Sequence, residues 1–485
     1  MNERSKAITR RGVLGAAVAA PFAAIDVPRM ASAAPEDWGQ WAPPFDMGGI
    51  AIHAILLHND DILFFQYVEG SPSSDHTSFT ATWNWRTGVT RLAPLPYDRD
   101  IFCCGQNVLA DGRFFMAGGH DHSTGKKQDA FGVRECDIYD PITRTWTPTP
   151  PMGAKRWYPT SVGLANGKTL VFGGVASPGV ASPTVDEYDA VTNTMRTLPS
   201  TATKTVGQYP RMHLLANGRL LKSGTSRGSW FFDPPTSRWS SGPSMLYGSR
   251  SNGVATLLPG CQSVLTAGGG APTRTVEVLD TAASTPRWQY SASLTYARIL
   301  ANAVVLPDGQ VLAVGGGQTF KYTNPVKVPE LWNPATGVWT PMAPQQAGRM
   351  YHATALLLPD GRVMSAGQDS GPLARFAEIW SPPYLFRGAR PTITGAPATI
   401  THGAVLRFTS LEASSLSRVV LIRGGSSTHQ IDTDQRSIPL TFSVSASTVS
   451  AQIPTNASLL PPGYYMLFAV NSLGVPSVAP WLHVD

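Results

Sequence analysis

A hairpin signal that recurs along this chain is the feature that most constrains its fold. A short polar turn, usually Asp-Gly or Asn-Gly, stands between two apolar, alternating stretches, and the second stretch often ends in a glycine step. Asp-Gly and Asn-Gly are the strongest short hairpin turns because both central positions need positive φ. The turns lie around Asp60-Asp61, Asp111-Gly112, Asn166-Gly167, Asn217-Gly218, Pro259-Gly260, Asp308-Gly309 and Asp360-Gly361.

A second signal accompanies the first and consists of an aromatic strand, a polar turn and a tryptophan. Examples are Tyr139-Asp140-Pro141 with Trp146, Phe232-Asp233-Pro234 with Trp239, and Trp332-Asn333-Pro334 with Trp339. Each unit thus offers two hairpins, and a period of roughly fifty residues is typical of kelch-type propeller blades. The sequence therefore predicts an all-β protein with a seven-bladed kelch propeller over residues 34–387, closed in a ring without long free edges.

The propeller signals end at Trp380-Ser381-Pro382-Pro383, and a different pattern follows. Residues 388–485 contain several short alternating segments and have roughly the length of an immunoglobulin-like β-sandwich, which we expect there. The composition agrees, because only 14% of the 485 residues are charged while glycine and proline number 46 and 41. That balance fits a turn-rich β protein.

Residues 1–33 have the pattern of an export signal. Thr9-Arg10-Arg11-Gly12-Val13-Leu14 is a twin-arginine pattern, a short apolar run follows, and Ala31-Ser32-Ala33 predicts a cleavage site. We expect a secreted or cell-envelope protein, of bacterial origin, with no membrane span. This segment carries half of the net charge of +6. Because no basic stripe with aromatics remains, we expect no nucleic-acid partner, and we expect a monomer.

Three chemically distinctive residues share one position in three repeats. Cys103, Tyr158 and His352 each stand nine residues before the turn glycine. Equivalent positions in stacked repeats occupy equivalent places in space, so these side chains are expected to meet on one axis. A thiol, a phenol and an imidazole together indicate a transition-metal site, and imidazole suits copper. The same offset holds Tyr209, Ser251 and Leu300 in other repeats, and Arg211 and His213 follow Tyr209 closely.

Four motifs in order resemble one known family, the copper radical oxidases (galactose oxidase and glyoxal oxidase). They are Phe102-Cys103-Cys104-Gly105, Arg156-Trp157-Tyr158-Pro159, Arg349-Met350-Tyr351-His352, and the tail segments Thr428-His429-Gln430-Ile431-Asp432-Thr433-Asp434-Gln435-Arg436 and Pro462-Gly463-Tyr464-Tyr465. The resemblance covers nearly all of the chain after residue 33. Arg156-Trp157-Tyr158-Pro159 is more similar to the glyoxal oxidase branch.

The resemblance implies one copper ion with Tyr158, Tyr351, His352 and His429 as its protein ligands. Tyr158 would be joined to Cys103 by a thioether, and the oxidised form of this pair would be the radical cofactor. Tyr351 would be the axial ligand and the catalytic base, and His429 would arrive on a loop of the C-terminal domain. The implied reaction oxidises an alcohol or a hydrated aldehyde and reduces O2 to hydrogen peroxide. One copper handles one electron, so a second redox group makes chemical sense for a two-electron oxidation.

The chain departs from the family where the galactose oxidases place a tryptophan over the linked tyrosine. The equivalent residue is Ala176, so another tryptophan, Trp157, would have to approach from elsewhere. The short loop Ala271-Pro272-Thr273 lacks the polar residues of a galactose pocket. We therefore expect small aldehydes or simple alcohols as substrates, in a pocket with Tyr209, Arg211 and Trp157.

Two alternatives to a radical oxidase stay open at this point. Many propellers are binding scaffolds, so the chain could be an exported carbohydrate- or protein-binding module with a vestigial metal site. It could also hold copper without a radical, for storage or sensing. The pairing of Cys104, Cys136 and Cys261 is likewise open, since export permits a bridge such as Cys104–Cys136.

Overall fold

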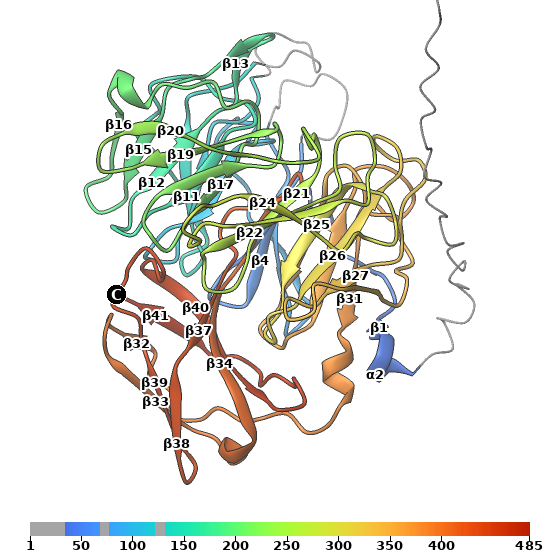
Figure 1. The fold of residues 1–485 in the computed structure, drawn as a ribbon. Helices are drawn as coiled ribbons and strands as arrows, with labels where there is room; N and C mark the ends of the chain where they lie inside the picture. The colour runs from blue at the N-terminus through green and yellow to red at the C-terminus, as the bar shows by residue number, and fades with distance from the viewer. Residues whose placement is uncertain (1–33, 68–76, 122–130) are drawn as a thin grey trace, which may run out of the picture.

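The computed structural model describes residues 34–67, 77–121 and 131–485, so the predicted export signal lies outside the described residues. Strands dominate the chain (Figure 1). The helical segments are single turns: α2 (Pro35–Trp38), η1 (Ser200–Ala202), η2 (Pro383–Phe386) and η3 (Ala413–Ser415). None of the described helices has the length and apolar character that a bilayer crossing requires. The sequence prediction of a β protein without ordinary helices is confirmed for these residues.

Seven sheets repeat one plan, in which strands adjacent in sequence pair in antiparallel order. The first four sheets comprise β3 (His53–Leu56), β4 (Asp61–Phe65), β5 (Thr80–Asn84) and β6 (Thr90–Leu92); β7 (Gly105–Val108), β8 (Phe114–Ala117), β9 (Cys136–Asp140) and β10 (Thr145–Thr149); β11 (Thr160–Gly163), β12 (Thr169–Phe172), β15 (Asp186–Asp189) and β16 (Thr194–Thr197); β17 (Arg211–Leu214), β18 (Leu220–Ser223), β19 (Gly228–Asp233) and β20 (Arg238–Ser244). The next three comprise β21 (Val254–Leu257), β22 (Ser263–Ala267), β23 (Val276–Asp280) and β24 (Trp288–Ser291); β25 (Ile299–Val305), β26 (Val311–Gly317), β27 (Glu330–Trp332) and β28 (Trp339–Pro341); β29 (Ala353–Leu357), β30 (Val363–Gly367) and β31 (Phe376–Ser381) with β1 (Gln40–Trp41) and β2 (Phe45–Asp46). A small hairpin, β13 (Val175–Ser177) and β14 (Val180–Ala181), stands between β12 and β15.

The first strands of these sheets lie beside one another. Strand β7 contacts β11, and contacts continue through β17, β21, β25 and β29 to β3. The strand β35 (Ser426–Thr428), from the C-terminal part of the chain, contacts both β3 and β7 and extends the sheet of β3. The start of the described chain joins the last of the seven sheets, because β1 pairs with β31. Segments far apart in sequence therefore lie side by side.

The repeated signals of the sequence correspond to two hairpins in each sheet. The turn glycines have positive φ, for example 87° at Gly112 and 81° at Gly361, and Asp60 takes the same conformation at 67°. The tryptophan of the second signal faces the aromatic residue before the polar turn. The cross-strand pairs are Tyr139 with Trp146, Phe232 with Trp239, and Trp332 with Trp339. Such aromatic pairs stabilise the outer hairpins.

Four of the sheets contain the same buried ion pair between an arginine and an acid. The pairs are Arg156 with Asp186 (2.7 Å), Arg250 with Glu277 (2.6 Å), Arg298 with Glu330 (2.6 Å) and Arg349 with Glu378 (3.3 Å). Each guanidinium also donates to a glycine carbonyl at the end of the second strand. The β17–β20 sheet differs, because it has Gly207 at the position of the arginine. Its second strand also carries a buried lysine, Lys222, at a position where the other sheets have uncharged residues. Lys222 donates to the hydroxyl of Ser226.

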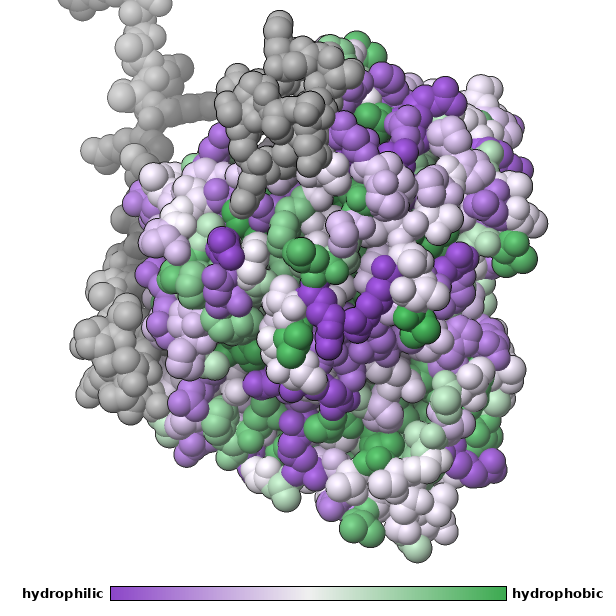
Figure 2. Space-filling model, turned by 180° about the vertical axis from the view of Figure 1, so that it is seen from behind, coloured by the Kyte–Doolittle hydropathy of each residue, from purple (hydrophilic) through white to green (hydrophobic). Residues whose placement is uncertain are grey.

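The C-terminal part of the chain, drawn in red in Figure 1, forms two more sheets. They comprise β32 (Thr399–Ile400), β41 (Trp481–Val484), β40 (Gly463–Asn471), β34 (Leu416–Arg423) and β37 (Arg436–Leu440), and β33 (Val405–Thr409), β39 (Thr448–Gln452) and β38 (Phe442–Ser445). Their inward residues form one apolar core. On the face in Figure 2, hydrophobic residues are scattered among hydrophilic ones, as is normal for a folded surface.

Candidate metal centre

Residues at the shared offset adopt one unusual backbone conformation. Cys103, Tyr158, Tyr209, Leu300 and His352 have φ of 59°, 61°, 38°, 65° and 65°. The left-handed conformation costs roughly 1–2 kcal/mol for residues other than glycine, and strain of this kind gathers at functional sites. The shared offset is thus a shared conformation.

One member of the predicted set is shifted by a residue. Asn252, with φ of 56°, takes the left-handed conformation that the offset assigned to Ser251. The reason is an extra residue in the turn of this repeat. The N–H of Leu258 donates to the carbonyl of Ser263, five residues on, whereas in the repeat of Cys103 the N–H of Leu109 donates to the carbonyl of Arg113, four residues on. The prediction for this repeat was therefore wrong by one position.

Backbone hydrogen bonds connect these positions from sheet to sheet. The N–H of Tyr158 donates to the Cys103 carbonyl (2.9 Å), and the N–H of Tyr209 donates to the Tyr158 carbonyl (2.7 Å). The N–H of Leu300 donates in the same way to Asn252 (2.8 Å). Tyr158, Tyr209 and Leu300 are therefore each fixed to the preceding sheet, which limits where their side chains can point.

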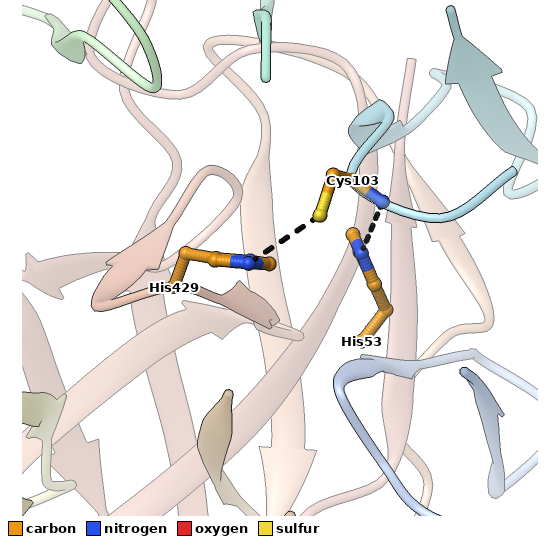
Figure 3. A group of neighbouring side chains, drawn as sticks. All are labelled: His53, Cys103 and His429. Atoms are coloured by element: carbon orange, nitrogen blue, oxygen red, sulfur yellow. Dashed lines mark hydrogen bonds between the residues drawn. The ribbon is translucent and has the colours of Figure 1, made fainter. Parts of the chain in front are cut away.

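The predicted site residues converge in space. The hydroxyl oxygens of Tyr158 and Tyr351 are 2.9 Å apart, and Tyr158 packs against the apolar cluster that contains the buried Cys103. The ring of His429 lies 4.5 Å from that of His352 and 5.0 Å from that of Tyr158, between centroids. Cys103 Sγ lies 3.5 Å from His429 Nε2 (Figure 3).

His429 stands at the tip of a tight hairpin between β35 and β36 (Ile431–Asp432). His429 and Gln430 are the two turn residues, with φ of 45° and 64°, as a type I′ turn requires. Strand β35 pairs with β3, and β36 contacts β21 and β25. The hairpin therefore carries His429 from the C-terminal part into the space between the first strands.

The hydrogen bonds of His429 determine its tautomer. The Thr428 hydroxyl donates its proton to the Ile52 carbonyl (2.9 Å), so it can only accept from His429 Nδ1, at 2.6 Å. Nδ1 therefore carries the proton of this neutral ring. The lone pair of Nε2 faces Cys103 and the two tyrosines.

His352 has a similar support. Its Nδ1 lies 2.8 Å from the carboxylate of Asp369, which also accepts from the Tyr322 hydroxyl. Burial opposes ionisation of Asp369, but its contacts with His352 and Tyr322 outweigh this and lower the pKa of the carboxyl. Neither ring nitrogen of His352 makes a hydrogen bond of ordinary geometry to a described residue, so Asp369 acts on Nδ1 as a close carboxylate and Nε2 is bare. A histidine with a carboxylate behind it and a bare nitrogen in front has the arrangement common in metal ligands.

The electrostatics of the site fit a cation. Burial lowers the pKa of His352 and of His429, so both rings are neutral at pH 7 and can bind a metal. Burial raises the pKa of Tyr158, and the nearby Cys103 and Tyr351 raise it further. Two neutral imidazoles and two phenols suit copper, and the positive charge would favour the phenolate forms.

A cavity of about 500 Å³ lies next to Tyr158, Tyr351 and His429. Its wall includes all three of the residues predicted for the pocket, namely Trp157, Tyr209 and Arg211. It also includes Gly207, where other sheets have the ion-paired arginine, and a Cβ added there would meet no atom within 4 Å. The missing arginine leaves room in this wall.

Trp157 contacts the tyrosine that Ala176 cannot reach. The rings of Trp157 and Tyr158 are 4.4 Å apart at 61°, an edge contact instead of a parallel stack. Trp157 is positioned by paired backbone hydrogen bonds with Val175 (2.8 Å each).

The four cysteines are all free and buried, so the Cys104–Cys136 bridge that the sequence left open does not form.

The sequence patterns did not identify His53. This histidine of β3 is fully buried, and its side chain lies with Cys103 and His429 within 4.8 Å, counted between possible ligand atoms. The three come from different parts of the chain, as Figure 3 shows. His53 stands seven residues before Asp60 instead of nine, within an apolar strand, where a lone histidine is no signal.

Comparison with known proteins finds similarity to galactose oxidases and glyoxal oxidases along most of the chain. Residues 265–383 match the glyoxal oxidase N-terminus family, and residues 390–484 match the galactose oxidase-like early set domain. A galactose oxidase of Gibberella zeae is 28% identical over 92% of this chain and 70% of its own. An aldehyde oxidase of Vitis pseudoreticulata is 28% identical over 82% and 84% of the two chains.

A solved structure extends the likeness to three dimensions. It is described as a fungal alcohol oxidase of the AA5 family in complex with copper, and it superposes with a TM-score of 0.82 at 27% identity. The match covers 93% of this chain and all of that one. The resemblance to the copper radical oxidases that the sequence motifs predicted is thereby confirmed, in sequence and in fold.

Proposed function

We propose that this protein is a copper radical oxidase that converts a primary alcohol and O2 into an aldehyde and H2O2, or a hydrated aldehyde into an acid. One observation carries the proposal: Cys103, Tyr158, Tyr351, His352 and His429 meet beside one cavity although they come from four distant parts of the chain. We assign Tyr158, Tyr351, His352 and His429 as copper ligands. Cys103 and Tyr158 would form the thioether cofactor.

Copper and the oxidised, thioether-linked phenol would together accept the two electrons of the substrate. The chain supplies the rest. Tyr351, as a phenolate, would take the proton of the substrate hydroxyl, and its oxygen lies 2.9 Å from that of Tyr158.

The cavity wall favours a small substrate. Aromatic rings of Trp157, Tyr209 and Phe320 line the cavity beside Tyr158 and Tyr351. Ligand pockets lined mainly by aromatic side chains suit small, partly apolar molecules, which supports the proposal of small aldehydes or simple alcohols.

We further propose the architecture and location that the sequence indicated. The seven repeated sheets, whose first strands follow one another in contact, would form a seven-bladed kelch-type propeller over residues 34–387. Residues 388–485 would form an immunoglobulin-like sandwich that contributes His429. Export by the twin-arginine pattern of residues 1–33 would place the enzyme outside the cytoplasm, as a monomer.

The decisive experiment combines peptide mass spectrometry with a peroxide assay after aerobic copper loading. We expect the Cys103 and Tyr158 peptides to be joined, two hydrogen atoms lighter than their sum, and peroxide to appear with small aldehydes. Tyr158→Phe should abolish both, while the exposed Tyr290→Phe should change neither. Separate peptides in copper-bound wild-type protein would refute the radical mechanism and favour a binding scaffold. Oxidase activity retained in Tyr158→Phe would refute the assignment of the cofactor.

A further inference from the structure

We propose that His53 is a positioning residue, which holds Cys103 in the backbone conformation from which its thiol is joined to Tyr158. This inference rests on the proposed function, because it concerns how that cofactor forms. The contact that carries it is a hydrogen bond of 3.1 Å from the Cys103 backbone N–H to His53 Nε2 (Figure 3).

The position of Cys103 explains why a side chain is needed there. Cys103 is left-handed, with φ of 59°, and fully buried. At Tyr158, Tyr209 and Leu300 the backbone N–H donates to a carbonyl of the preceding sheet. The N–H of Cys103 donates to the imidazole instead. Without His53, a buried N–H at a strained residue would lose its acceptor, which is unfavourable.

The hydrogen bonds of His53 leave a single protonation state. A backbone N–H can only donate, so Nε2 must accept and Nδ1 must carry the proton. Nδ1 lies 2.6 Å from Gln106 Oε1, which accepts that proton. Burial lowers the pKa of His53 to about 3, although the Gln106 contact acts against this. The ring is thus neutral at pH 7 and fixed in the accepting tautomer.

The same hydrogen bonds argue against His53 as a copper ligand. Both of its ring nitrogens have protein partners, whereas Nε2 of His352 has none among the described residues. His53 therefore lies close to Cys103 and His429 because it binds the backbone of Cys103. This proximity does not indicate a second metal site.

Strand β3 also supports the other side of the site. The ring of His53 stacks on Phe65 at 4.3 Å between centroids. His53 pairs with Thr428, the residue before His429, in the ladder of β3 and β35. One strand thus aligns Cys103 through a side chain and His429 through the backbone.

The step that His53 would assist balances with O2 as the oxidant. A bond forms between Cys103 Sγ and the ring carbon of Tyr158 next to its hydroxyl-bearing carbon, while the S–H and that C–H bond break. The two protons and two electrons released reduce O2 to H2O2, with copper as the catalyst of the proposed function. When the thiol is held next to the tyrosine ring, the two groups no longer have to find the reactive geometry by random motion, and positioning of this kind accelerates reactions.

The test measures thioether formation against time in copper-loaded protein exposed to air, by peptide mass spectrometry. His53→Phe keeps a ring against Phe65 but has no acceptor, and we expect about tenfold slower cross-linking, the effect of one lost buried hydrogen bond. His53→Gln offers an amide oxygen to the Cys103 N–H and should restore most of the rate. Gln106→Met keeps the imidazole but frees its tautomer, so an intermediate rate is expected. Copper affinity, measured by competition with a chelator, should stay within about threefold in all three.

Three results would overturn the inference. Cross-linking of His53→Phe at the wild-type rate would exclude a positioning role, and a large loss of copper affinity would make His53 a ligand instead. If wild-type protein itself fails to cross-link, the proposed function fails separately. Hydrogen exchange at the Cys103 amide then decides the positioning, because unchanged protection in His53→Phe would show that His53 does not hold this residue. Should His53→Phe fail to fold, His53→Gln and Gln106→Met carry the same measurements.

Discussion

Replacement of Asp369 by alanine tests whether His352 binds copper with the support that the structure shows. The carboxylate lies 2.8 Å from His352 Nδ1 and accepts from the Tyr322 hydroxyl. Without it, the buried His352 ring loses the carboxylate beside Nδ1, whose charge favours the proton on that nitrogen and so leaves Nε2 free. The variant should therefore bind copper more weakly while its fold persists.

Two estimates of the size of this effect agree. Loss of a carboxylate behind a ligating histidine lowers metal affinity about 10–100-fold. A hydrogen bond to a charged group contributes about 1.5–3 kcal/mol, and ~1.4 kcal/mol corresponds to a tenfold change in affinity. Tyr322→Phe removes only one of the two bonds to Asp369 and leaves His352 supported, so its loss should be no more than about threefold.

The assay is competition for copper between the protein and a chelator of known affinity, with thermal unfolding of the metal-free protein as the measure of fold. Asp280→Ala, an exposed aspartate on β23, is the matched control. If Asp369→Ala binds copper within about twofold of wild type and unfolds at the same temperature, then His352 is not a ligand oriented by Asp369. The reasoning from its bare Nε2 would then be refuted.

The remaining predictions concern the cavity, the ion pairs and the buried lysine. Thr225→Trp, in the cavity wall, should raise KM for bulky aldehydes more than for the smallest ones, and a uniform change across substrates would contradict this pocket. Arg298→Met alone should destabilise the protein by about 3–5 kcal/mol, because it leaves the buried Glu330 without its cation. The double variant with Glu330→Leu should recover only part of this, because Glu330 also accepts from the N–H groups of Thr295 and Tyr296; calorimetry compares the two. Burial, followed by the nearby Arg211 and Lys204, lowers the pKa of Lys222 to about 8. Since the unfolded chain keeps this proton up to a pH of about 10.4, the Lys222 contribution to stability rises with pH between about 8 and 10. Lys222→Met should therefore raise the melting temperature at pH 7 and lose this advantage by pH 10, and an equal gain at both pH values would contradict the assignment.

The repeated plan of the sheets could be predicted because its signals are local. A turn such as Asp111-Gly112 needs only its own residues to adopt positive φ, and Trp146 faces Tyr139 across a turn that both residues flank. The convergence of Cys103, Tyr158 and His352 followed from the same regularity. These inferences needed no knowledge of tertiary contacts beyond equivalence between repeats.

The supporting residues of the site could not be predicted in this way. His53 acts through a hydrogen bond to Cys103, fifty positions away, and Asp369 acts through His352, seventeen positions before it. Neither stands at the shared offset, and each has an ordinary surrounding in sequence. The error at Ser251 has a similar origin, because one extra turn residue moved the left-handed position to Asn252.

The repeated backbone explains how a site of this kind can arise on such a fold. The sheets provide several equivalent left-handed positions, and Leu300 at one of them packs with Met350 beside Tyr351 as a plain apolar residue. The strain and the backbone bonds are therefore properties of the repeat, while the chemistry depends on which side chain each repeat presents. The N–H of Cys103 is held by a side chain, whereas the N–H groups of Tyr158, Tyr209 and Leu300 are held by carbonyls. A feature that breaks the repeat next to the reactive sulfur is better explained by the chemistry of that sulfur than by the stability of the sheet, which is why His53 is the residue to test.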